Sequence, residues 1–143
     1  MTSRALLAEV FMRALYLLLL TASLVVLVRG HNHPGGGFIG GLMAAAASAA
    51  YALVFTAAEA LRRLPLGPLR LAGCGVLLGL LSGIPALLQG RPFLTHLWVT
   101  LQLGGLELPV STVMLFELGV YCCVWGAIGG YGLAVITASE EAA

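Results

Sequence analysis

The chain has 143 residues, of which 60% are hydrophobic and only 9% are charged, and its charges come from seven Arg and six Glu without any Lys or Asp. This composition excludes a soluble globular domain, in which about a quarter of the residues are charged, and a disordered chain, which needs low hydrophobicity. It also excludes nucleic-acid binding, which needs a clustered basic face. At about 20 residues per membrane-spanning helix, one integral membrane domain of three to five spans is expected.

The first apolar segment predicts a transmembrane helix over residues 5–28 rather than a cleaved signal peptide. The apolar run ends at Arg29 without the small-residue cleavage site that a signal peptide needs. Glu9 and Arg13 lie four residues apart, so they share a helix face with the acidic residue first, which is the favourable order. We interpret them as an ion pair at the membrane interface.

The second and third spans are predicted over residues 37–58 and 71–88, and both are rich in small residues. Lipid supplies no hydrophobic drive between helices, so small residues mark faces where helix backbones approach closely. The second helix is therefore expected to contact other helices rather than lipid. Pro85 is expected to kink the third helix near its end, because proline removes a backbone donor and clashes one turn back.

The segment after the third span changes its pattern. Polar and apolar residues alternate over residues 98–103, and the pair Gly104-Gly105 follows. Alternation of this kind beside two glycines predicts a short β-hairpin. An exposed strand edge cannot lie in lipid, so we expect the hairpin in water or against a partner. The fourth span is predicted over residues 109–136, interrupted only by Glu117.

The distribution of arginine predicts the orientation of the chain. Four spans place both termini on one side, together with five of the seven Arg residues (Arg4, Arg13, Arg62, Arg63 and Arg70, against Arg29 and Arg91). By the positive-inside rule, both termini are expected in the cytoplasm. The predicted fold is all-α and integral to the membrane, with four helices and a short hairpin in the outer loop between helices three and four.

The densest polar segment follows the first span and consists of Gly30, His31, Asn32, His33, Pro34, Gly35, Gly36, Gly37 and Phe38. One hypothesis is a stand-alone metal-binding membrane protein that uses His31, His33 and His96. Metal sites normally need three or four ligands, and no Cys or Asp lies near the two histidines. The glycines could also form an anion nest, but the strand and lysine of a P-loop are missing. The favoured interpretation is a tight re-entry into the membrane.

Glu117 is the ionisable residue that lies farthest inside a predicted span. An intramembrane carboxylate is a functional hypothesis by default, since burying its charge is costly, and such a group suits reversible proton binding. The alternative is a structural carboxylate that pairs with an Arg or a backbone donor of another subunit, and both interpretations stay open. Tyr121, four residues later, shares the helix face of Glu117.

Catalytic chemistry is not indicated anywhere in the chain. No nucleophile, base and orienting group come together in the sequence, so we predict no enzyme activity, no cofactor and no metal. The three cysteines, Cys74, Cys122 and Cys123, all fall inside predicted spans. We interpret them as small buried hydrophobic residues rather than as a disulfide or metal pattern.

Three segments carry a family resemblance. The segment from Gly30 to Leu42 resembles the GHNxPGGGFxGGL signature of the B-type (MnhB/MrpB) component of the multisubunit Mrp (or Mnh) sodium/proton antiporters. Residues 92–96 and 115–121 are similar to two further stretches of that family, in the same order. Many relatives carry Asp where this chain has Glu117, which keeps the charge but lengthens the side chain. The resemblance covers essentially the whole chain.

The resemblance implies a small component of a hetero-oligomeric complex in the prokaryotic plasma membrane. That complex exchanges cytoplasmic Na⁺ for external H⁺, driven by the proton motive force, and contains A-, C-, D-, E-, F- and G-type subunits in addition to the B type. The two large subunits look like proton-pumping subunits of respiratory complex I. The small subunits are needed for assembly, and a role for them in the ion path stays open. An alternative is the same B-type module in an ion-translocating membrane-bound hydrogenase or sulfur-reducing oxidoreductase complex.

The resemblance and the residue patterns together define the candidate site. Glu117 is the candidate for handling the ion or proton. The segment from Gly30 to Phe38, here called the motif loop, is expected to form the re-entry into the membrane. Thr95, His96 and Tyr121 are supporting candidates.

Overall fold

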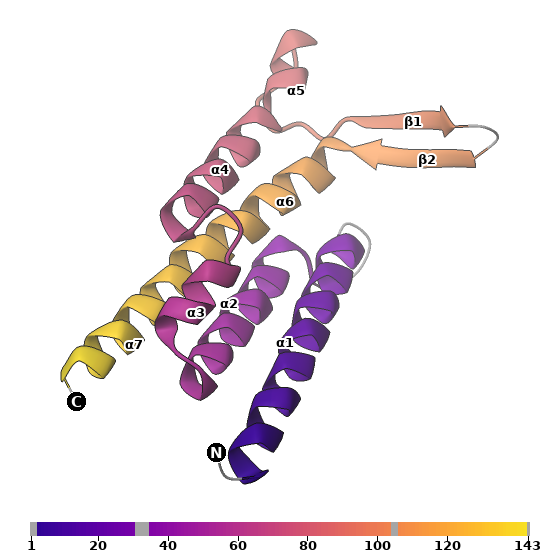
Figure 1. Ribbon diagram of the computed structural model, residues 1–143. Coiled ribbons are helices and arrows are strands. Elements are labelled where there is room, and N and C mark those ends of the chain that lie inside the picture. Colours follow the sequence, from indigo (N-terminus) through magenta and orange to yellow (C-terminus); the bar gives the residue numbers. More distant parts are fainter. Residues whose placement is uncertain (1–2, 31–34, 104–105, 143) are drawn as a thin grey trace.

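The computed structural model describes residues 3–30, 35–103 and 106–142 (Figure 1). The side chains of residues 3–5, 99 and 101–109 lie outside the description. The elements in chain order are α1 (Ser3–Arg29), α2 (Gly37–Val54), α3 (Ala57–Arg63), α4 (Pro68–Leu81), α5 (Ile84–Leu88), β1 (Trp98–Leu103), β2 (Leu106–Ser111), α6 (Thr112–Val124), the π-helical turn η1 (Trp125–Gly129) and α7 (Gly130–Ala142).

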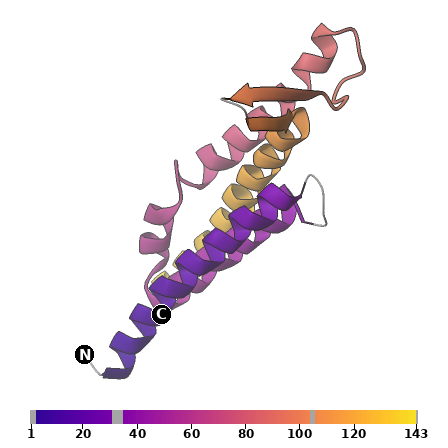
Figure 2. The same cartoon turned by 90° about the vertical axis from the view of Figure 1, so that its right-hand side faces the viewer.

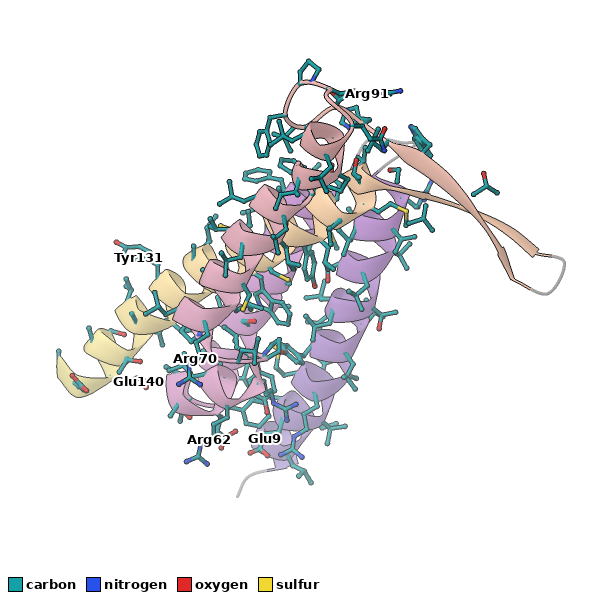
Figure 3. The ribbon with its side chains drawn as sticks, turned by 90° about the horizontal axis from the view of Figure 1, so that it is seen from above. Glu9, Arg62, Arg70, Arg91, Tyr131 and Glu140 are labelled. Atoms are coloured by element: carbon teal, nitrogen blue, oxygen red, sulfur yellow. The ribbon has the colours of Figure 1, made fainter. Side chains whose placement is uncertain are left out.

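Four apolar stretches in the described part of the chain are long enough to cross a membrane: Leu6–Arg29, Gly37–Val54, Ala57–Leu88 and Thr112–Ala142. The predicted all-α membrane fold with four long apolar helices is confirmed. Labelled charged side chains lie toward the two ends of the bundle, with Glu9, Arg62 and Arg70 at one end and Arg91 at the other (Figure 3). This arrangement keeps those charges away from the middle of the apolar helices.

Helix boundaries differ from the predicted spans where a capping residue or proline intervenes. The second span ends at Val54 instead of residue 58, because Thr56 caps the start of α3: its side chain accepts a hydrogen bond from the Glu59 backbone N–H. The third apolar stretch is interrupted between α4 and α5, just before Pro85, whose ring is incompatible with a continuous helix.

The fourth apolar helix also differs from its predicted bounds. It starts at Thr112 rather than at residue 109, because residues up to Ser111 belong to β2 and the Ser111 side chain caps the helix at Val113. It continues beyond residue 136 through α7. The turn η1 joins α6 to α7, so the apolar stretch Thr112–Ala142 runs on without a loop.

The centre of the bundle is the contact of α2 with α6 and η1, flanked by α1 on one side and α4 on the other. Half of the α2 span is buried within this single chain, against 11% of the α1 span. Glycines allow this closeness: a Cβ on Gly75 of α4 would lie 2.5 Å from the carbonyl oxygen of Gly119 in α6. The expected contact of the second helix with other helices is therefore present within the chain.

A buried cluster of aromatic rings and hydroxyl groups forms the core near the middle of the helices. The Trp125 indole nitrogen donates a hydrogen bond to Ser48 Oγ at 3.0 Å, and Ser48 donates to the Ala44 carbonyl at 2.9 Å. Tyr16 packs its ring against Tyr51 with centroids 5.1 Å apart. Its hydroxyl lies beside Ser48, yet it is the buried side-chain polar atom that has no hydrogen-bond partner among the described residues.

The strands β1 and β2 pair antiparallel, from Trp98 opposite Ser111 to Leu103 opposite Leu106. They occupy the segment whose alternation predicts a hairpin, and residues 104–105 lie outside the described residues. The pair projects from the end of the bundle that is farther from both chain termini (Figures 1 and 2). Its base is tied to α6, because the backbone N–H of Thr112 donates to the Leu97 carbonyl at 3.1 Å.

Candidate functional site

The candidate site lies where the N-terminus of α2 meets the second turn of α6. The carboxylate oxygen Oε2 of Glu117 accepts a hydrogen bond from the backbone N–H of Gly37. The first N–H groups of a helix have no partner within the helix, and an anion is favourable at that end of the helix dipole. Gly36, at the cap position, has no side chain to do this. Glu117 therefore caps α2 from another helix.

The glycines before α2 leave the space that Glu117 occupies. Gly36 has a φ of 89°, a left-handed conformation that favours glycine, and a Cβ there would lie 2.6 Å from Glu117 Oε2. A Cβ on Gly37 would collide with the Glu117 carbonyl oxygen. The backbone N–H of Gly36 also donates to the Val26 carbonyl of α1 at 3.2 Å. The glycine segment thus joins α1, α2 and α6 at one point.

Tyr121 lies one helical turn after Glu117 and links the same three helices. Its hydroxyl forms a hydrogen bond of 2.9 Å with Ser23 Oγ of α1, and its ring lies against Gly40 of α2. The ring also makes an edge contact with Trp125, with centroids 5.8 Å apart. Ser23 and Ser48 were not among the sequence-based site candidates. The signal that could have found them is a serine in an otherwise apolar span.

A groove of about 370 Å³ borders the Glu117 side chain. Its walls come from the end of α1, the end of β2 and the first turns of α6, and they include Leu27, Val110, Met114, Leu115, Glu117 and Leu118. We call this hollow the Glu117 groove. Most of its lining is apolar, and Glu117 itself is half-buried. The carboxylate therefore lies between a closely packed helix junction and an open apolar hollow.

The supporting candidates Thr95 and His96 do not reach the Glu117 groove. His96 lines a separate cavity of about 270 Å³, together with Ser82 and Thr112. The Thr95 hydroxyl donates to the Pro92 carbonyl at 2.7 Å, which stabilises the loop before β1. Tyr121, in contrast, is brought next to the Glu117 junction.

The motif loop is described only in part. His31, Asn32, His33 and Pro34 lie outside the described residues. Gly30 lies against the Gly36 backbone, so the two ends of the loop meet. The Phe38 side chain is 55% exposed. Within the described residues there is no group of three His, Cys, Asp or Glu side chains that could hold a metal ion.

Comparison with known proteins identifies the family of this fold. A family model described as "Domain related to MnhB subunit of Na+/H+ antiporter" matches residues 7–130. The B-type component of the Na⁺/H⁺ antiporter of Bacillus subtilis is 38% identical over 112 residues, which are 76% of this chain and 77% of that protein. A relative from Staphylococcus saprophyticus is 40% identical over 113 residues, 78% of this chain and 79% of its own length.

A solved structure shares the fold. The match belongs to the structure of the Mrp complex from a Dietzia species, with a TM-score of 0.72 and 34% sequence identity. The matched region covers 89% of this chain but only 13% of that chain. In that complex, a fold of this kind is thus one portion of a much longer polypeptide.

Proposed function

Because the chain belongs to the family of MnhB subunits of Na⁺/H⁺ antiporters, we propose that it works as the B-type component of a multisubunit antiporter in the prokaryotic plasma membrane. It is part of a transporter and not an enzyme. The observation that carries the proposal is the family match over residues 7–130, which includes the glycine motif and Glu117. The partners would be the A-, C-, D-, E-, F- and G-type subunits, with both termini of this chain in the cytoplasm.

Within the antiporter, we propose that Glu117 handles the transported proton or cation. The geometry supports this role, because one carboxylate oxygen is held by the Gly37 N–H while the side chain borders the Glu117 groove. A carboxylate held at one oxygen keeps its position, and its other oxygen still has lone pairs that can take a proton or pair with a cationic group. Tyr121 would support the site by holding α6 against α1 through Ser23.

We also propose a role in assembly, which rests on the exposed apolar surface. Only 11% of the α1 span and 28% of the Thr112–Ala142 span are buried within the chain. Large apolar side chains such as Phe11, Leu77 and Tyr131 are more than half exposed. A surface of this kind is suited to contact with lipid and with the helices of neighbouring subunits.

The test is to purify the tagged chain from its native membrane and to measure exchange in vesicles with and without it. We expect the other antiporter subunits to co-purify, and we expect Na⁺-dependent proton movement to require this chain. Co-purification with iron–sulfur or nickel subunits would instead identify a hydrogenase or sulfur-reducing complex. Isolation of the chain alone would contradict both assignments.

A further inference from the structure

We propose that the Glu117 groove is the docking site for a transmembrane helix of another subunit, and that this helix presents an Arg or Lys side chain to Glu117. The inference rests on the proposed function, because the docking helix would belong to the same antiporter. It adds the surface through which this chain contacts its neighbour and the chemistry of the residue that this neighbour contributes.

The shape of the groove supports an occupant from outside the chain. Its walls come from three separate elements, and the side chains of Val110, Leu115 and Leu118 are each between 37% and 39% exposed. From the α2 side the carboxylate is closed off, because the Gly36 and Gly37 backbones lie against Glu117. Among the described residues, the groove is the open space that borders the carboxylate.

The charge of Glu117 supports a basic partner. Glu117 lies within the candidate span Thr112–Ala142, and its described hydrogen bond is the one that Oε2 accepts from Gly37. Within the part of the chain that the structure describes, no Arg side chain forms an ion pair with it. A backbone N–H stabilises a carboxylate but leaves its charge in place. Charges buried in apolar surroundings are normally paired.

The lining of the groove favours Arg or Lys over a lipid chain. A hydrocarbon chain would fill the apolar part but would leave the carboxylate against hydrocarbon. The side chains of Arg and Lys combine an apolar stem with a charged end, which matches an apolar wall that ends at Glu117. A segment that reaches the groove from the lipid side is helical, because irregular backbone is not tolerated where it faces lipid.

The comparison with the Mrp complex supports the source of this helix. The fold covers only 13% of the matched chain in that complex. Polypeptide beyond this fold is thus part of the same complex in that relative. We therefore propose a subunit of such a complex as the source of the helix.

The experiment uses a photo-reactive benzophenone amino acid at Leu118, in the groove, within the intact complex. The matched control is the same amino acid at Leu80 of α4, which is 54% exposed. Leu80 lies at the same level of the bundle, because its neighbour Gly79 contacts Gly119, the residue after Leu118. We expect the Leu118 probe to link to a helix of another subunit that has Arg or Lys within one helical turn of the linked residue. The Leu80 probe is expected not to label that helix.

Several results would overturn the docking proposal. They are a link only to lipid, a link to a second copy of this chain, a link within the chain, including residues 31–34, and a link to a helix without Arg or Lys nearby. Each of these results, obtained while the other subunits still co-purify, would contradict the docking proposal and leave the proposed function intact. Failure of the wild-type chain to co-purify would instead contradict the proposed function.

A second measurement tests the charge separately from the position. In Glu117→Gln the amide oxygen can still accept the Gly37 N–H, but the negative charge is gone. We expect the yield of the Leu118 link to fall several-fold in this variant, whereas Glu117→Asp, which keeps the charge, should retain most of it. An unchanged yield in Glu117→Gln would show that docking does not depend on a basic side chain.

Discussion

The backbone N–H of Gly37 donates a hydrogen bond to the carboxylate of Glu117, although 80 residues separate the two in the sequence. One side chain of α6 thereby caps α2, and it does so beside the glycines that connect α2 to α1. The glycine motif and the intramembrane carboxylate are therefore two halves of one junction. A substitution at either residue should therefore alter the structure at the other.

We expect Glu117→Gln to lower Na⁺/H⁺ exchange by about 100-fold or more, the range that a proton-transferring group contributes. The complex should still co-purify, because the glutamine amide can cap Gly37 in place of the carboxylate. The measurement is Na⁺-dependent proton movement in membrane vesicles. Glu117→Asp is the control and should keep much of the activity. Wild-type exchange in the glutamine variant would rule out ion handling by Glu117.

We expect Gly36→Val to block incorporation of the chain into the complex. The new side chain would meet Glu117 Oε2 at 2.6 Å, on a backbone with a φ of 89° that valine strongly disfavours. Co-purification with the other subunits measures the effect.

Gly90→Val is the matched control for Gly36→Val. Gly90 also has a positive φ, of 67°, but a Cβ there would have no neighbour within 4 Å. The Gly90→Val chain should lose only the stability that the new backbone strain costs, about 1–3 kcal/mol. It should still assemble with the other subunits. Equal recovery of both variants would contradict the junction at Gly36.

The contact between α4 and α6 leads to a third prediction. In Gly75→Ala the methyl group would lie 2.5 Å from the Gly119 carbonyl oxygen and closer still to the Cys123 backbone. The helices would have to separate, and overpacking of this kind destabilises by about 1–3 kcal/mol. The purified complex should therefore dissociate at a lower temperature.

Gly73→Ala is the control for the α4 contact, because it lies on the same helix with no atom within 4 Å of the added Cβ. It should be neutral or stabilising, by up to about 1 kcal/mol, since alanine favours a helix more than glycine does. If the two alanine variants dissociate at the same temperature, close packing at Gly75 is not important for stability.

Two buried tyrosines are expected to respond differently to the loss of a hydroxyl group. Tyr121→Phe removes the hydrogen bond to Ser23 and should lower the free energy of unfolding by about 1 kcal/mol. The loss stays modest because Ser23 also donates to the Leu20 carbonyl. Tyr16→Phe removes a hydroxyl without a described partner, so stability should be unchanged or higher. Denaturation of the purified complex gives both values, and a larger loss for Tyr16→Phe would contradict the described bonding.

Local sequence signals were sufficient for the membrane fold. Long apolar runs predicted four membrane-spanning helices, because hydrophobicity over about 20 residues depends on composition alone. Residue type also singles out the glycine motif and Glu117 as site candidates, and the structure places them in contact. Helix ends were less well predicted, since Thr56 and Ser111 act as caps, and a capping serine or threonine resembles any other polar residue near a loop.

Only the tertiary structure decided which residues meet. The sequence left open whether Glu117 handles an ion or pairs with a group of another subunit, and it did not relate the residue to Gly37 of the same chain. The same holds for Tyr121 and Ser23, which lie 98 positions apart. Periodicity reports which face a side chain occupies on its own helix, and it carries no information on which other helix packs against that face. Close glycine contacts between α2, α4 and α6 set that pairing, and they exist only once the helices are assembled.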